Sequence, residues 1–486
     1  MRHERQVHLV TYLGSTFEEV CADVLRKVTP SDRERRNTLK LADRLTNNVM
    51  VVAKEAGLDV KVRVEGSVAK DTWLSKEPDV DIFMRVPTTM PRESFGTTCL
   101  EIARKATEGF KQIERFAEHP YLESVVDGVR VNIVPCYQVE RGEWISATDR
   151  TPFHTDYVKP LLDETTRGEV RLLKKFMKGI GVYGAEIRVG GFSGYLCELL
   201  TLNYGSFMKI LKAVADWKEK RIIDYEKHYD GRERELEKIF GEPLVLVDPV
   251  DKGRNVAAAV RRERLDEFVI ASRAFLQRPD SWFFTPDYIA PLKVKDLVST
   301  LKTRGSTIVF VKLGGVKTVS DILWGQLYKS QRALRKMLRQ NDFDVIRDVT
   351  WGDEEDLNMF IFEVEQRFLP LVKKHFGPPI RKRIECKRFL EKHVGASHTI
   401  SGPYVEGSRW VAEIKREYTD VAELLNEKLR DGGRHVGVAH LISQAIPNSL
   451  EVMVNEKVAG LYSSNPKFAK FLTEYLEGKP RWLVHE

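Results

Sequence analysis

The sequence predicts a multidomain α+β protein, and three observations support this prediction. The chain has 486 residues, which is enough for three or four domains that each bury a core. Apolar residues alternate with polar ones in short runs such as 60–64, as in strands, whereas segments such as 16–56 have the apolar spacing of helices. Hydrophobic residues make up 42% of the chain and charged residues 31%, a balance that is typical of globular domains.

Composition also excludes several classes of protein. No run of 18 apolar residues occurs, so we expect no transmembrane helix and no membrane partner. Residues 1–14 are charged and lack the apolar core of a signal peptide. The five cysteines are scattered without a C-x-x-C pair, which argues against a disulfide framework and a zinc site. We therefore expect a cytoplasmic protein, whose net charge of +7 is compatible with nucleic-acid binding.

The clearest candidate site lies between residues 65 and 83. An apolar alternation leads into Gly66 and Ser67, where backbone N–H groups and a hydroxyl suit a triphosphate. Asp79 and Asp81 follow two residues apart, so on a strand both carboxylates point to the same side. Adjacent carboxylates repel each other unless a cation lies between them, and Mg²⁺ prefers oxygen ligands. An Asp-x-Asp pair alone is weak evidence, because most such pairs are solvated.

Further elements are predicted on both sides of this stretch. Helices are expected over 16–56, with a break at Thr29–Asp32, and over 95–110. Residues 121–126 and 129–134 predict a hairpin, because Asp127-Gly128 between two apolar alternations is a strong turn signal.

Later segments are predicted from the same patterns. Short strands are expected at 306–313, 359–364 and 400–404, and a helix at 321–339. The stretch after Asn255 predicts a capped helix of small residues.

These motifs resemble a known family. Gly66-Ser67 followed by Asp79-Val80-Asp81 is similar to the signature of polymerase-beta-type nucleotidyltransferases. The longer string GSVAKDTWL, residues 66–74, resembles the archaeal class I CCA-adding enzymes, which are tRNA nucleotidyltransferases. The glycine-rich strings 181–186 and 190–199 are similar to the central domain of the same enzymes.

The resemblance implies an architecture and an activity. It implies a polymerase-beta-like nucleotidyltransferase head at residues 1–155, a helical central nucleotide-binding domain at 156–280, and an α/β C-terminal body and tail at 281–486 that binds tRNA. The implied activity is template-independent addition of CCA to the tRNA 3′ end from CTP and ATP, with Mg²⁺ and release of pyrophosphate. The implied partner is the acceptor stem and TψC arm of tRNA, and the implied assembly is a homodimer.

The resemblance also assigns roles to single residues. Asp79, Asp81 and Asn132 take the catalytic and metal-binding positions. The nucleotide would be bound by Gly66, Ser67, Lys70, Thr151, His154, Lys174, Tyr183, Arg254 and Asn255. Two basic clusters in the C-terminal part are expected to contact RNA phosphates; they contain Lys329, Arg332, Arg335, Lys336, Arg381, Lys382 and Arg383.

Asn132 departs from the family pattern, which has an aspartate before Val-Pro-Cys at this position. Two-metal nucleotidyl transfer uses three carboxylates, and an amide brings no negative charge and accepts no proton. An inactive engineered form, a natural variant with a weaker ligand and a protein that has lost catalysis remain open. So do another nucleotidyltransferase, of the poly(A) polymerase or oligoadenylate synthase type, and a tRNA-binding or nucleotide-binding protein without catalysis.

Overall fold

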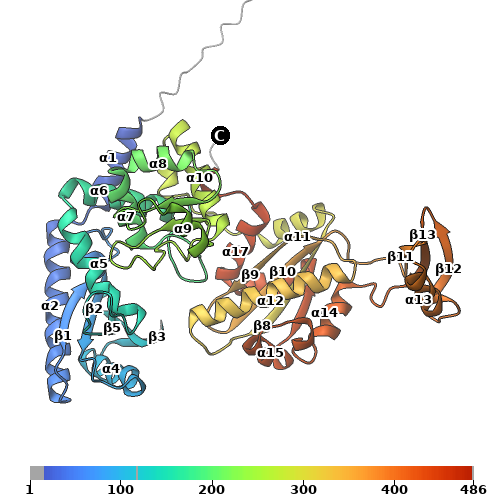
Figure 1. The fold of residues 1–486 in the computed structure, drawn as a ribbon, viewed down its shortest axis with the longest axis horizontal. Helices are drawn as coiled ribbons and strands as arrows, with labels where there is room; N and C mark the ends of the chain where they lie inside the picture. Colours follow the sequence, from blue (N-terminus) through green and yellow to red (C-terminus); the bar gives the residue numbers. More distant parts are fainter. Residues whose placement is uncertain (1–15, 117–118, 484–486) are drawn as a thin grey trace, which may run out of the picture. The chain divides into compact units, whose positions relative to one another are not determined.

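The computed structural model describes residues 16–116 and 119–483, and Figure 1 shows its fold. The expectation for residues 1–14 lies outside these ranges. The chain forms two compact units, residues 1–287 with 479–486, and residues 288–478. Both contain helices and sheets. Among the described residues, no helix has the length and the apolar character that crossing a bilayer needs.

The head of the first unit is a five-stranded sheet with α2 (Asp32–Glu55) and α4 (Arg92–Ala106) on one face. Side by side, the strands are β1 Lys61–Glu65, β2 Asp79–Val86, β5 Val129–Tyr137, β4 Pro120–Val126 and β3 Lys111–Phe116. β2 and β5 are parallel, and the other pairs are antiparallel. Val80, Ile82 and Met84 of β2 are fully buried against the helices. Because side chains alternate along a strand, the two aspartates of β2 lie on the opposite face.

The hairpin and the N-terminal helices were predicted correctly. Asp127 and Gly128 have φ angles of 52° and 79°, the positive values that a two-residue hairpin turn requires. The helical region divides into α1 (Phe17–Val28) and α2, and the Ser31 side chain caps α2 by accepting from the N–H of Glu34. Strand β3 was not predicted.

Helices surround the apolar core of the central region. α1 packs against α6 in this core, although it precedes the head in sequence. Trp482 belongs to the same core, with its ring stacked on Phe283 at a centroid distance of 5.6 Å. The elements are α5 Thr151–Val158, α6 Glu164–Gly179, α7 Gly194–Tyr204, α8 Phe207–Ala215, α9 Glu233–Ile239 and α10 Arg262–Gln277, with the parallel pair β6 Arg221–Ile223 and β7 Leu244–Leu246.

The helix expected after Asn255 is not formed. Residues 256–259 are turns, and α10 begins only at Arg262. The Asn255 Oδ1 accepts from the backbone N–H groups of Leu246 and Ala257. An asparagine side chain that satisfies nearby backbone groups in this way competes with helix formation.

The second unit is built around an antiparallel sheet of four strands in the order β14-β8-β10-β9. Its strands are β8 Thr307–Gly314, β9 Val345–Gly352, β10 Leu357–Val364 and β14 Glu451–Val454. Phe360 and Phe362 of β10 face one apolar layer, and Met359 and Ile361 face the other. The first layer contains α12 Ser320–Gln340, α14 Val421–Leu429 and α15 His440–Ala445, and the second α11 Val294–Thr303, α16 Ala459–Ser464 and α17 Pro466–Glu477.

A smaller sheet follows β10 in sequence. Its strands are β11 Val372–Pro379, β13 Arg409–Lys415 and β12 Thr399–Glu406, with α13 Arg383–His393 packed on them. The predicted strands near 306, 359 and 400 are confirmed as β8, β10 and β12, and the predicted helix is α12. Strands β9, β11, β13 and β14 were not predicted.

Candidate active site

The two aspartates of β2 lie beside two donors of β5. The parallel register pairs Asp79 with Arg130 and Asp81 with Asn132. The Asn132 Nδ2 lies 2.9 Å from Oδ1 of Asp79 and 2.9 Å from Oδ1 of Asp81. The Arg130 Nε and Nη2 donate to Oδ1 and Oδ2 of Asp79 at 3.1 and 2.7 Å. Burial and the nearby charge of Asp79 raise the pKa of Asp81 to about 7, so the pair is short of positive charge even with Arg130 present.

Gly66 brings the chain close to this pair. It begins α3 (Gly66–Ala69) directly after β1, with a φ of +68°. A Cβ at this position would collide with Oδ2 of Asp81. Glycine therefore allows both the left-handed backbone and the close approach of α3 to a carboxylate.

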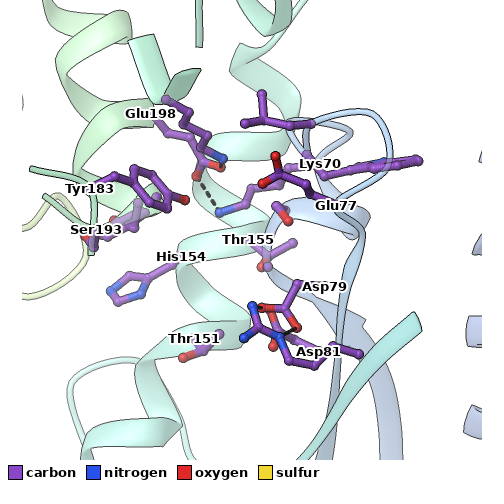
Figure 2. Close-up of a pocket in the computed structure, with 18 of the residues that line it drawn as sticks. Lys70, Glu77, Asp79, Asp81, Thr151, His154, Thr155, Tyr183, Ser193 and Glu198 are labelled. Carbon is purple, nitrogen blue, oxygen red and sulfur yellow. Dashed lines mark hydrogen bonds and ion pairs between the residues drawn. The ribbon is translucent and has the colours of Figure 1, made fainter. Parts of the chain in front are cut away.

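A cavity of about 420 Å³ opens over the aspartates, between the head and the central helices. Figure 2 shows residues of both regions pointing into it. Of the residues predicted to bind nucleotide or metal, those that line it are Gly66, Ser67, Lys70, Asp79, Asp81, Thr151, His154, Lys174, Tyr183 and Arg254. Asn132 contacts the aspartates without being one of the lining residues, and the Asn255 amide is used by backbone groups.

Glu198 of α7 joins the two cavity lysines. Its Oε2 lies 2.5 Å from the Nζ of Lys70, the contact drawn in Figure 2, and its Oε1 lies 3.3 Å from the Nζ of Lys174. The Thr72 hydroxyl donates to Oε1 at 2.6 Å. Burial opposes charge on Glu198, but the two ammonium groups outweigh it and lower its pKa. Burial lowers the pKa of Lys174 even though Glu198 lies beside it. All three side chains line the cavity.

Asp248 holds a second group of cavity side chains. Its Oδ2 lies 2.9 Å from Nε2 of His154 and accepts from Nη1 of Arg254 at 2.7 Å, and its Oδ1 accepts from the Tyr195 hydroxyl at 3.2 Å. Burial opposes the charge of Asp248, but its bonds with His154 and Arg254 lower its pKa to about 2. Burial lowers the pKa of His154 despite that bond. A neutral imidazole and a fixed guanidinium thus line this side of the cavity.

The predicted RNA-contacting residues lie in the second unit. On α12, Lys329, Arg332 and Lys336 are exposed, whereas Arg335 forms a 3.1 Å ion pair with Asp348. At the start of α13, Arg381, Lys382 and Arg383 are exposed, and Lys382 lies 3.8 Å from Glu385. An exposed cation that has no carboxylate partner is the kind that phosphate contacts use.

Three protein families match successive parts of the chain. "Nucleotidyltransferase domain" matches residues 51–154, "tRNA nucleotidyltransferase, second domain" residues 168–285, and "CCA-adding enzyme, C-terminal domain" residues 304–455. The CCA-adding enzyme of Methanosarcina barkeri is 36% identical over 454 residues, which cover 93% of this chain and 97% of that protein. The CCA-adding enzyme of Methanothermobacter thermautotrophicus is 37% identical over 425 residues, 86% and 90% of the two chains. The chain belongs to the CCA-adding enzymes.

Family membership confirms the resemblance, the nucleotidyltransferase class and the α+β fold class predicted from the sequence. It also sets aside the poly(A) polymerase and oligoadenylate synthase alternatives, because the C-terminal domain of CCA-adding enzymes is present. Nucleotidyltransferases generally use a divalent metal ion. Among the described residues, no three His, Cys, Asp or Glu side chains are placed to hold one together.

Three functional candidates in this CCA-adding enzyme were not found from the sequence. Glu198 lies within the predicted glycine-rich string, but nothing local shows that it meets Lys70, which is 128 positions away. Asp248 precedes Pro249 and has the pattern of an ordinary turn residue. Arg130 resembles a solvated strand residue until the register places it beside Asp79.

Replacing Glu198 by glutamine should lower the free energy of unfolding by about 3–5 kcal/mol, because two buried ammonium groups lose their counter-charge. Urea denaturation followed by circular dichroism measures the loss. Glu101→Gln, an exposed glutamate on α4, is the control and should stay near the unmodified stability. Equal stability of both variants would contradict the role given to Glu198.

Replacing Gly66 by alanine should abolish nucleotidyl transfer, because the new Cβ displaces the Asp81 carboxylate. Gly57→Ala is a matched control, since Gly57 has a φ of +74° and open space around its Cβ position. Both variants should lose about 1–2 kcal/mol from the left-handed backbone. Only Gly66→Ala should also lose activity in a nucleotide-incorporation assay, and retained transfer would contradict the close approach.

Proposed function

We propose that this chain adds CCA to the 3′ end of tRNA from CTP and ATP, with release of pyrophosphate. The proposal rests on one observation above all. A single cavity brings the acid pair of β2 together with Lys70 and Lys174, which are paired through Glu198, and with Arg254. Acidic and basic groups that face each other across a cavity suit a triphosphate with its metal ion. The head at 1–155 and the central domain at 156–280 would both contribute residues that bind the triphosphate and its metal ion.

Asp79 and Asp81 fit one Mg²⁺ ion. Burial and the charge of Asp79 raise the pKa of Asp81, and a bound cation would relieve the repulsion between the two carboxylates. When bound, such an ion would polarise the phosphoryl group and neutralise charge that develops on it. Asn132 turns its amide N–H toward the pair, so its side chain in this arrangement adds no oxygen ligand.

The other cavity residues would bind and orient the nucleotide. Lys70 and Lys174 would hold the triphosphate with the help of Ser67 and the backbone N–H groups at the start of α3. Tyr183 and Thr151 would complete the walls. Phosphoryl transfer depends mainly on such positioning and charge neutralisation, so rigid support of the lysines by Glu198 favours the reaction.

On the side of the cavity away from the lysines, Asp248 would hold Arg254 and His154 in position to contact the base and sugar of the nucleotide. A planar guanidinium offers paired donors to base edges, and its bond with Asp248 leaves further N–H groups free to serve. Because His154 is held neutral and donates from Nε2, its Nδ1 would act as an acceptor.

The C-terminal part at 281–486 would hold the tRNA by its acceptor stem and TψC arm. Double-stranded RNA is bound largely through its shape and phosphates, which suits exposed arginine and lysine side chains on α12 and α13. The family resemblance further implies a homodimer, which light scattering of the full chain would reveal as a mass of two chains.

Replacing Asn132 by aspartate should raise the rate of CMP incorporation into tRNA that lacks its last three nucleotides. The gain should reach about a thousandfold, which corresponds to about 4 kcal/mol of transition-state stabilisation. The affinity for CTP should change much less, because the lysines that bind phosphate are unaltered. Equal rates in both forms would show that two aspartates suffice, and tailing of unstructured RNA with ATP alone would contradict CCA addition.

A second candidate function is tRNA binding without catalysis, which Asn132 favours. In that case transfer would be measurable only in Asn132→Asp. The same incorporation assay, run with and without the substitution, separates the two functions.

Replacing Arg332 and Lys336 by glutamine should weaken tRNA binding and reduce its salt dependence. The slope of log affinity against log salt should fall by about 1.4–1.8, because each of the two cations that neutralises a phosphate contributes about 0.7–0.9. Filter binding across salt concentrations measures the slope. Lys40→Gln with Lys105→Gln, two exposed lysines of the head, is the matched control. An unchanged slope would show that α12 does not contact phosphates.

A further inference from the structure

The acid pair of β2 is already engaged by side chains of the neighbouring strand. Parallel pairing sets Arg130 beside Asp79 and Asn132 beside Asp81, and paired residues of adjacent strands point to the same side of a sheet. The backbone register therefore imposes this neighbourhood, whatever the rotamers of the two donors.

The donors occupy most of the oxygens that a metal site would use. Oδ1 of Asp79 accepts from both Arg130 and Asn132, Oδ2 of Asp79 accepts from Arg130, and Oδ1 of Asp81 accepts from Asn132. The remaining oxygen, Oδ2 of Asp81, faces Gly66 at the start of α3. One side of the pair is thus left for an ion, next to the segment that would bind phosphate.

The charges of the side chains around the acid pair also favour a single bound ion. Two-metal transfer uses three carboxylates for two divalent ions, whereas this pair has two carboxylates, a neutral amide and a guanidinium that stays protonated. The Arg130 side chain is 56% exposed, so its ion pair alone is too weak to exclude a metal. The neutral Asn132 is the larger difference, because it removes a ligand and bridges the remaining two.

Glu123 is a candidate for a third carboxylate, since β4 places it directly opposite Asn132. However, Arg115 binds both of its oxygens, through Nε at 3.3 Å and Nη2 at 3.1 Å. The Glu123 side chain is only 13% exposed and is held by this fork. It therefore does not replace the missing aspartate.

We propose that the acid pair of this chain binds a single divalent ion, because Asn132 supplies no third carboxylate and, together with Arg130, occupies three of the four aspartate oxygens. This inference rests on the proposed nucleotidyl transfer. In the resulting site, the ion that accompanies the triphosphate is retained. On the side of β5, the positive charge beside the aspartates comes from the Arg130 side chain and not from a second metal ion.

The number of bound Mn²⁺ ions per chain tests this proposal. Equilibrium dialysis of the full chain with a non-hydrolysable CTP analogue should give one Mn²⁺, and the paramagnetic resonance spectrum should lack the coupling of a paired site. Two ions in the unmodified chain would overturn the proposal. This count needs no variant, so it holds even where a substituted chain fails to fold.

The same Mn²⁺ count, repeated on substituted chains and without nucleotide, tests the proposal further. Asn132→Asp combined with Arg130→Met should bind two ions, whereas the control Glu123→Gln should still bind one; a single ion in the folded double variant would count against the proposal. Without nucleotide, one ion or fewer is expected, and two would overturn the proposal whether or not the analogue binds. Failure of the analogue to bind would contradict the proposed function instead.

Discussion

The parallel pairing of β2 with β5 is the constraint on which the candidate site depends. Hydrogen bonds between these strands fix which residues of β5 lie beside the aspartates. The opposite face of β2 is buried by α2 and α4, so a shift of one residue would place the carboxylates in the apolar core. The energy of the core thus maintains the geometry of the acid pair. The identity of two residues on β5, Arg130 and Asn132, then decides how much charge the pair retains.

Two buried carboxylates connect the head with the central helices around the same cavity. Glu198, on α7, holds Lys70 and Thr72 of the head. Asp248 holds His154 at one end and Arg254 at the other. Neither carboxylate is exposed to solvent, and each is compensated by positively charged or hydrogen-bonding partners. The cavity is therefore organised before any nucleotide enters, which reduces the ordering that binding would otherwise require.

Much of the candidate site was predictable because its residues lie in short, locally recognisable patterns. The alternation of β2 fixes the common side of Asp79 and Asp81, and the positive φ angles of Asp127 and Gly128 follow from their residue types. Glu198 and Asp248 were not predictable, because their partners are distant in sequence and only tertiary packing brings them together. The helix wrongly expected after Asn255 has a similar cause. The Asn255 side chain accepts hydrogen bonds from β7 and from the turn that follows it, and such a contact produces no periodic pattern in the sequence.

The packing of Trp482 in the first unit has a consequence for synthesis of the chain. The ring lies in the same core as Phe283, although residues 288–478 form a unit of their own between them. Domains usually fold in the order in which they leave the ribosome. Here the catalytic unit cannot complete its apolar core until the whole second unit has been translated. The nascent enzyme must therefore carry an incomplete core through that interval.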